Sequence, residues 1–151
     1  MPSSRVPLTR SQIMSRVRGR DTRPEILVRR ALRERGIGYR LQARDLPGSP
    51  DVVMRGRGLA IFVHGCFWHR HEGCRLCSTP KSNVEFWSAK FVRNVERDAR
   101  DLQRLQDAGW NVVVVWECET RSTAGMGDAM DRIVSLAGQG TRIRRLPRPS
   151  R

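Results

Sequence analysis

The feature that most constrains this chain is a dense cluster of cysteine and histidine between residues 64 and 77. The segment reads His-Gly-Cys-Phe-Trp-His-Arg-His-Glu-Gly-Cys-Arg-Leu-Cys and contains all three histidines and three of the four cysteines of the 151-residue chain. Zinc prefers four Cys or His ligands in a tetrahedron, usually paired at short spacings. We therefore expect a structural zinc site in this segment, which shows neither helical nor strand periodicity.

The spacing leaves two ligand sets open. Cys66, His71, Cys74 and Cys77 could supply all four donors locally. Alternatively, three of these residues combine with Cys118, which follows a run of valines and could reach back across a sheet. Four cysteines in a reducing compartment are more often ligands or free thiols than disulfides. At least two histidines remain outside the metal set, and a histidine beside a carboxylate is a candidate general base.

The excess positive charge lies at the two ends of the chain. The 29 Lys and Arg against 15 Asp and Glu give a net charge of +14, but residues 1–20 and 141–151 each carry five Arg and no acid. We therefore expect a basic N-terminal arm over 1–20, one folded domain over 21–138 and a basic tail over 139–151. Such arms either neutralise phosphates and release counterions or only keep the protein soluble.

Length and composition restrict the class of protein further. A chain of 151 residues corresponds to one domain, and its pI near 11.5 makes nucleic acid the leading partner. No apolar run approaches the ~18 residues that a membrane span needs. The first twenty residues lack the apolar stretch of a secretory signal. We therefore expect a cytoplasmic protein without a membrane partner.

The hydrophobic pattern predicts a mixed α/β domain around a central sheet. The expected elements are a helix capped by Thr22 and ended by Gly36, strands at 39–42, 51–54 and 59–64, a helix over 84–108 closed by Gly109, a fully buried strand over 111–117 and a helix around 126–136. Because residues 55–58 form a tight turn, the strands on either side of it should pair as a hairpin.

Two carboxylates occupy positions that carboxylates usually avoid. Asp98 falls within the apolar stripe of the long helix, which consists of Trp87, Phe91, Val95, Leu102 and Leu105. An inward Asp must be paired, so it either caps a loop amide or orients a histidine or a metal from the 64–77 segment. Asp51 opens a strand, and with Glu25 on the first helix it makes a workable site for Mg²⁺.

Aromatic residues accompany the metal ligands. Phe67 and Trp68 lie inside the ligand cluster, in a segment without periodicity. They either cover the metal or, in a protein with nucleic-acid character, stack on bases or wedge between base pairs. Trp87 shares the apolar stripe of the long helix, and its position there predicts an ordinary core residue.

Four blocks of sequence closely resemble the very-short-patch repair endonucleases. They are Ile61-Phe62-Val63-His64-Gly65-Cys66-Phe67-Trp68-His69, Glu85-Phe86-Trp87, Asn94-Val95-Glu96-Arg97-Asp98 and Val115-Trp116-Glu117-Cys118. These bacterial enzymes nick DNA beside the T:G mismatch left when 5-methylcytosine deaminates. The resemblance, from about Met14 to Cys118, implies a fold similar to type II restriction endonucleases, with a mixed sheet flanked by helices and a structural zinc.

The resemblance also implies catalytic roles. Asp51 would hold Mg²⁺ at the scissile phosphate, His69 would activate the attacking water with Asp98 orienting it, and His64 would assist at the phosphate. Glu25 would contact metal-bound waters. The restriction-enzyme pattern expects Glu-x-Lys on the second strand, where this chain has Phe62-Val63-His64-Gly65. Val63 can offer the metal only its backbone carbonyl, so His69 must perform the task that a lysine often performs.

For the zinc, the resemblance implies the ligands Cys66, His71, Cys74 and Cys118, with Cys77 as a spare. Phe67, Trp68 and Trp87 would insert into the base stack beside the mismatch, in place of the core role predicted for Trp87 above. Lys90 and Asn94 would add DNA contacts.

The implied partners are double-stranded DNA with a T:G mismatch and, downstream, mismatch-repair proteins and a repair polymerase. The enzyme would be a monomer in the bacterial cytoplasm, associated with the nucleoid. Two alternatives stay open: a restriction-type or general repair nuclease of the same fold, and a non-catalytic zinc-dependent DNA-binding module. A site with a His–Asp pair favours the enzymes over the module.

Overall fold

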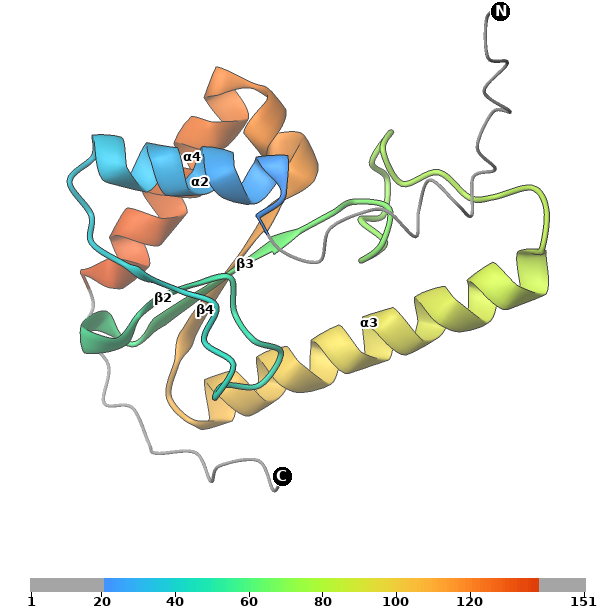
Figure 1. The fold of residues 1–151 in the computed structure, drawn as a ribbon, viewed down its shortest axis with the longest axis horizontal. Coiled ribbons are helices and arrows are strands. Elements are labelled where there is room, and N and C mark those ends of the chain that lie inside the picture. Colours follow the sequence, from blue (N-terminus) through green and yellow to red (C-terminus); the bar gives the residue numbers. More distant parts are fainter. Residues whose placement is uncertain (1–20, 139–151) are drawn as a thin grey trace, which may run out of the picture.

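The computed structural model describes residues 21–138, and Figure 1 shows their arrangement. The elements are helices α2 (Arg23–Glu34), α3 (Val84–Asp107) and α4 (Thr123–Ala137), strands β1 (Arg40–Leu41), β2 (Val52–Met54), β3 (Leu59–His64) and β4 (Asn111–Trp116), and the 3-10 helices η1 (Arg55–Arg57) and η2 (Glu117–Arg121). The strands form one sheet in the order β1-β2-β3-β4. The two predicted basic arms lie outside the described residues.

The sheet is mixed, as the pattern predicted. β1 and β2, and β2 and β3, pair antiparallel, whereas β3 and β4 run parallel. The hairpin turns through η1 to Gly58, whose φ of 61° is the left-handed conformation that glycine tolerates best. Because β3 and β4 are parallel, with His64 opposite Trp116, both strands end at the same edge of the sheet. The segments that leave this edge contain the predicted site.

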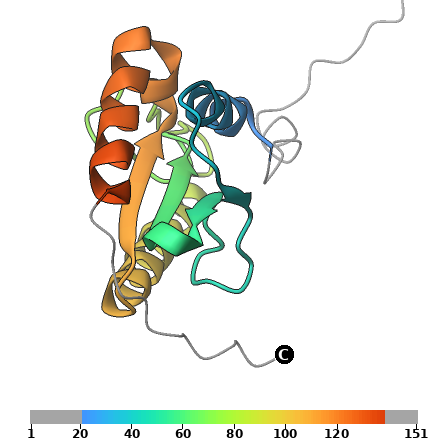
Figure 2. The same ribbon diagram turned by 90° about the vertical axis from the view of Figure 1, so that its left-hand side faces the viewer.

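Both faces of the sheet are covered, which explains why β3 is apolar without alternation. Leu59, Ile61 and Val63 pack with α2 and α4 in one core, while Ala60 and Phe62 pack with the C-terminal part of α3 in another. Figures 1 and 2 show α2 and α4 on one side of the sheet and α3 on the other. This is the layered architecture of a restriction-endonuclease-like fold, as expected. No helix within residues 21–138 is long and apolar enough to cross a membrane.

Helix ends follow the local chemistry of the sequence. The Thr22 side chain caps α2 by accepting a hydrogen bond from the amide of Glu25. Gly109, with φ of 92°, follows the end of α3 in the left-handed conformation predicted for it. The last helix begins at Thr123, three residues earlier than expected, because Ser122 caps it through the amide of Gly125.

Three other expectations were wrong in detail. Strand β4 ends at Trp116 and is not fully buried, since Val112 and Val114 are partly exposed on the face towards α3. Strand β1 has only two residues, because Gln42 turns the chain with φ of 46°. Val95 does not belong to a buried stripe, as 44% of it is exposed. In Figure 1 the N-terminal half of α3 extends beyond the sheet, and its buried residues Trp87 and Phe91 pack against Phe67 from the segment after β3 instead.

Candidate active site and metal centre

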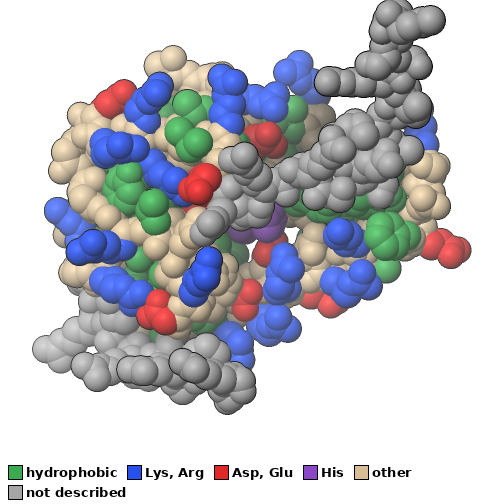
Figure 3. Space-filling model, in the orientation of Figure 1, with side chains coloured by type: hydrophobic (Ala, Val, Ile, Leu, Met, Phe, Trp, Pro, Cys, Tyr) green, Lys and Arg blue, Asp and Glu red, His purple; other side chains and the backbone are tan. Residues whose placement is uncertain are grey.

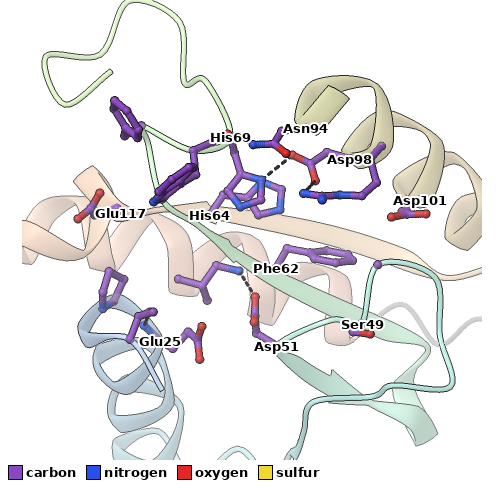
Figure 4. Close-up of a pocket in the computed structure, with 18 of the residues that line it drawn as sticks. Glu25, Ser49, Asp51, Phe62, His64, His69, Asn94, Asp98, Asp101 and Glu117 are labelled. Carbon is purple, nitrogen blue, oxygen red and sulfur yellow. Dashed lines mark hydrogen bonds and ion pairs between the residues drawn. The ribbon is translucent and has the colours of Figure 1, made fainter. Parts of the chain in front are cut away.

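A cavity of about 970 Å³ opens at the edge where β3 ends. Its walls come from five parts of the chain: the start of α2, the loop before β2, the end of β3 with the following loop, the middle of α3 and the first residue of η2. Asp51, His64, His69, Asp98 and Glu25 all line it, and Figure 4 shows them facing one another across it. The structure therefore brings together the five side chains for which catalytic roles were expected.

His69 and Asp98 form a hydrogen-bonded pair. Nδ1 of His69 lies 2.5 Å from Oδ2 of Asp98, and both side chains are mostly buried. Burial acts to raise the pKa of Asp98, but the hydrogen bond from His69 and the nearby positive charges together outweigh it, so the pKa is lowered. An ionised carboxylate only accepts hydrogen bonds, so Nδ1 of His69 carries the proton and Nε2 is left as the basic nitrogen. Asp98 therefore orients a histidine, and the alternative that it caps a loop amide is wrong.

His64 stacks on His69. The two rings are 3.8 Å apart at an interplanar angle of 5°. Burial, together with the neighbouring His69, lowers the pKa of His64 to about 3, so its ring is neutral at cellular pH. Ligand atoms of His64, His69 and Asp98 lie within 4.8 Å of one another and could surround a cation. The direct His69–Asp98 contact is shorter than the separation of two ligands on one ion, which favours a hydrogen-bonded pair over a ligand pair.

Asp51 lies at the point where β2 begins beside β3. Its Oδ2 accepts a hydrogen bond from the backbone amide of Val63 at 2.7 Å, and within the described part of the chain its Oδ1 accepts none. Burial, assisted by the charge of Glu25, raises the pKa of Asp51 to about 6. The amide and carbonyl of a strand residue face the same edge, so the carbonyl of Val63 points to the side where Asp51 lies. These two oxygens are hard donors of the kind that Mg²⁺ prefers.

Glu25 is buried on the first turn of α2 and takes part in a small charge network. Its Oε2 accepts hydrogen bonds from the amide of Asp21 at 2.8 Å and from Arg29 at 3.1 Å. Burial nevertheless raises the pKa of Glu25. Glu25 and Asp51, two carboxylates that are both costly to ionise, thus line the same cavity. A cation bound between them would reduce this cost.

A second cluster lies beside the cavity. Cys66, His71, Cys74 and Cys118 place their ligand atoms within 4.8 Å of one another, whereas Cys77 does not belong to this group. Nδ1 of His71 lies 3.6 Å from Sγ of Cys66 and 3.5 Å from Sγ of Cys118. Sulfur and nitrogen on a tetrahedral ion, at bond lengths of about 2.3 and 2.0 Å, are separated by about 3.5 Å. The four side chains therefore fit a tetrahedral metal, with Cys118 rather than Cys77 as the fourth ligand.

Trp116 connects the two clusters, and the sequence analysis assigned it no role. Its ring stacks on His71 at 4.2 Å and meets His64 edge-on at 5.4 Å. Trp116 is the last residue of β4 and precedes Cys118 by two positions. The signals in the sequence were this proximity to a candidate ligand and its place in one of the four blocks that resemble the endonuclease family.

The three aromatic residues of interest lie together in a cluster of their own. Phe67 and Trp87 pack with Phe91, and Trp68 is partly buried against them. Phe67 and Trp87 are only 8% and 7% exposed. The ammonium group of Lys90 lies 4.9 Å from the ring centre of Trp68, and the Asn94 amide donates to the Trp68 carbonyl at 3.2 Å. Lys90 and Asn94 thus hold the segment that carries Trp68, next to the cavity that both also line.

Arg70 is a second residue without an expected role. It has φ of 54° between two histidines, and its guanidinium donates hydrogen bonds to the carbonyls of Phe67 and Ser78 and to the hydroxyl of Thr79. The same group lies 4.0 Å from the ring centre of Phe91. Arg70 therefore ties the metal-binding segment to the aromatic cluster.

The chain is similar to known proteins over most of its length. The family profile described as DNA mismatch endonuclease Vsr matches residues 5–75. A relative from Escherichia coli (strain K12), named DNA mismatch endonuclease Vsr, is 44% identical over 120 residues, which cover 80% of this chain and 76% of the relative. Another from Xanthomonas oryzae pv. oryzae, named Type II nicking enzyme V.XorIIP, is 49% identical over 113 residues, or 75% of this chain and 82% of the relative. The chain therefore belongs to the Vsr family of DNA mismatch endonucleases.

Proposed function

We propose that this protein is a Mg²⁺-dependent endonuclease that nicks the T-containing strand of DNA at T:G mismatches arising from 5-methylcytosine deamination. The observation that carries the proposal is the single cavity in which a partly buried carboxylate, Asp51, faces a His69–Asp98 pair. The names of the relatives, a mismatch endonuclease and a nicking enzyme, support the same class of reaction. The specificity for the T-containing strand and for the T:G mismatch is inferred from the family resemblance described above.

His69 would act as the general base. Its Nδ1 proton is engaged by Asp98, so Nε2 is available to remove a proton from the attacking water. The ionised Asp98 stabilises the imidazolium that forms and keeps the ring in the required tautomer. His64 is neutral and stacked on His69, and it would donate a hydrogen bond to a phosphate oxygen. Because it carries no charge, it would not repel His69 when His69 becomes protonated.

Asp51 and the carbonyl of Val63 would hold the Mg²⁺, and Glu25 would accept hydrogen bonds from its water ligands. A bound Mg²⁺ supplies positive charge that stabilises the pentacoordinate phosphate. The amide of Val63 fixes the Asp51 carboxylate, so one oxygen is oriented before a cation binds. The raised pKa of Asp51 supports this role, because a carboxylate that is costly to ionise gains most from an adjacent cation.

The second cluster would hold a structural Zn²⁺ through Cys66, His71, Cys74 and Cys118. Burial raises the pKa of the Cys66 thiol to about 12, so this side chain becomes a thiolate only beside a cation. A closed set of four sulfur and nitrogen donors is typical of structural rather than catalytic zinc.

For mismatch recognition, the aromatic cluster would supply the wedge. Trp68 is its most accessible member and lines the cavity together with Lys90, while Phe67 and Trp87 pack against it. A mismatched step costs less to unstack than a paired one, so insertion there contributes to selectivity. Lys90 and Asn94 would contact the DNA beside the inserted ring.

The test is a nicking assay on duplexes labelled on either strand. Duplexes with one T:G mismatch, another mismatch or only matched pairs are incubated with or without added Mg²⁺. We expect a single nick in the T strand of the T:G duplex, only with Mg²⁺. Equal cleavage of matched DNA would instead indicate a restriction-type or general repair nuclease. Binding without any cleavage would indicate a zinc-dependent DNA-binding module. Randomised flanking bases would then identify the preferred sequence context.

A further inference from the structure

All the basic residues of α3 lie on one face of the helix. They are Lys90, Arg93, Arg97, Arg100 and Arg104, at intervals of three and four residues. At 100° per residue they fall within an arc of roughly 80° and extend over about 21 Å of helix. The acids of α3 lie outside this arc: Asp98 and Asp101 line the cavity, and the others are on the opposite flank. We call these five residues the basic stripe.

The basic stripe begins at the cavity and continues away from it. Lys90 and Arg97 line the cavity, whereas Arg93, Arg100 and Arg104 do not. Figure 3 shows Lys and Arg side chains gathered along α3 beside the hollow in which histidine is visible. A phosphate held at Asp51 and His69 would therefore have positive charge next to it in the direction of α3.

The side chains of the stripe are available for a ligand. Arg93 and Arg104 are exposed and form no ion pair with any other described residue. Arg97 and Arg100 are 52% and 63% exposed, and their nearest carboxylates, at 3.8 and 3.9 Å, are only at the limit of ion pairing. The charge of the stripe is thus not neutralised within the described part of the protein.

We propose that the basic stripe of α3 binds the phosphates that flank the scissile one, so that the DNA backbone follows this helix out of the cavity. This inference rests on the proposed function for the nature of the ligand. Arginine contacts to phosphate fix the register of a duplex without reading its sequence. The stripe would therefore add affinity equally for matched and mismatched DNA and present the bond to be cleaved to His69.

The test compares two triple variants that remove the same charge. In one, Arg93, Arg100 and Arg104 are changed to Gln, which keeps the helix propensity. In the control, Arg30, Arg33 and Arg40, which are also exposed and unpaired among the described residues, are changed to Gln. Binding of labelled T:G and matched duplexes is measured by fluorescence anisotropy at several salt concentrations, with Ca²⁺ in place of Mg²⁺ to prevent cleavage.

We expect the stripe variant to reduce the slope of log K against log salt by about 2.7, because each lost phosphate contact removes about 0.9. The control should reduce it by less than one contact. The preference for T:G over matched DNA should stay unchanged, and nicking at saturating DNA should keep its rate while KM rises. Equal slopes in both triple variants would overturn the proposal. If the stripe variant reduces the salt dependence of DNA binding as expected but the unmodified protein nicks no duplex, the proposed function is contradicted and the basic stripe is not.

Discussion

Two clusters of ligand-type side chains arise from the same segment, residues 64–77, and differ in chemistry. Each recruits one residue from a distant element: Asp98 of α3 completes the cavity cluster, and Cys118 of η2 completes the sulfur cluster. The cavity cluster has a carboxylate, two imidazoles and open space, whereas the sulfur cluster is closed by four mutually facing donors. One segment therefore supplies members of both clusters, and Cys66 of the sulfur cluster lies two residues from His64 and three from His69 of the cavity cluster.

The largest expected effect is on the sulfur cluster. Cys66→Ser should destroy the fold, because structural zinc contributes about 10–16 kcal/mol and a domain of this size has only about 5–15 kcal/mol of net stability. Thermal unfolding followed by circular dichroism, together with metal analysis, measures this. Cys77→Ser is the matched control and should keep the metal and the melting temperature. Loss of metal in Cys77→Ser with retention in Cys118→Ser would show that the ligand set is wrong.

On the cavity side, Asp51→Asn should abolish nicking and leave the fold intact. Asp51 is a partly buried carboxylate whose pKa is raised by burial, so its replacement by a neutral amide removes a desolvation cost. Without added Mg²⁺, the melting temperature should therefore be unchanged or higher. Asp101→Asn, which removes another carboxylate from the same cavity, should retain most of the activity. If Asp51→Asn nicks normally, Asp51 is not a metal ligand of the reaction.

The substitution Asp98→Asn tests whether the hydrogen bond between Asp98 and His69 is needed for nicking. An Asn amide can donate to Nδ1 of His69 and so stabilise the wrong tautomer, which should lower the rate of nicking by on the order of 10²–10⁴-fold. Single-turnover nicking on a T:G duplex measures the rate, and the bound metal should remain stoichiometric. A variant that loses metal together with activity would mean that the two clusters are not separable as we describe them.

The smallest effect is expected at Trp116, which both clusters share. Trp116→Leu removes the ring stacked on His71 and should weaken metal binding by about 10–100-fold, the usual cost of losing support for a ligand. Competition with a chromogenic chelator measures this affinity. Trp116→Phe keeps a flat ring and should restore most of it. Unchanged affinity in the Leu variant would remove Trp116 from the support of the metal.

The sequence alone predicted the parts of the site whose signals are local. The density of Cys and His at 64–77 indicated the metal, and an Asp inside a helical stripe indicated a partner for a histidine. The contacts of Trp116 and Arg70 depend on how β4 packs against residues 66–80, and no hydrophobic periodicity in the sequence predicts this packing. Likewise, the exposure of Val95 follows from where the sheet ends, which the pattern of α3 alone does not contain.

The parallel pairing of β3 with β4 has a consequence for the order of folding. The donors at 66, 71 and 74 leave the ribosome long before Cys118, and the fourth donor reaches them only after β4 has docked beside β3. A nascent chain that ends before this point has three of the four donors, and its strand β3 is paired with β2 on one edge only. Capture of the ion therefore requires the most non-local pairing in the sheet, and such pairings form slowly because a long loop must close first. Metal uptake during translation would thus report the completion of the sheet.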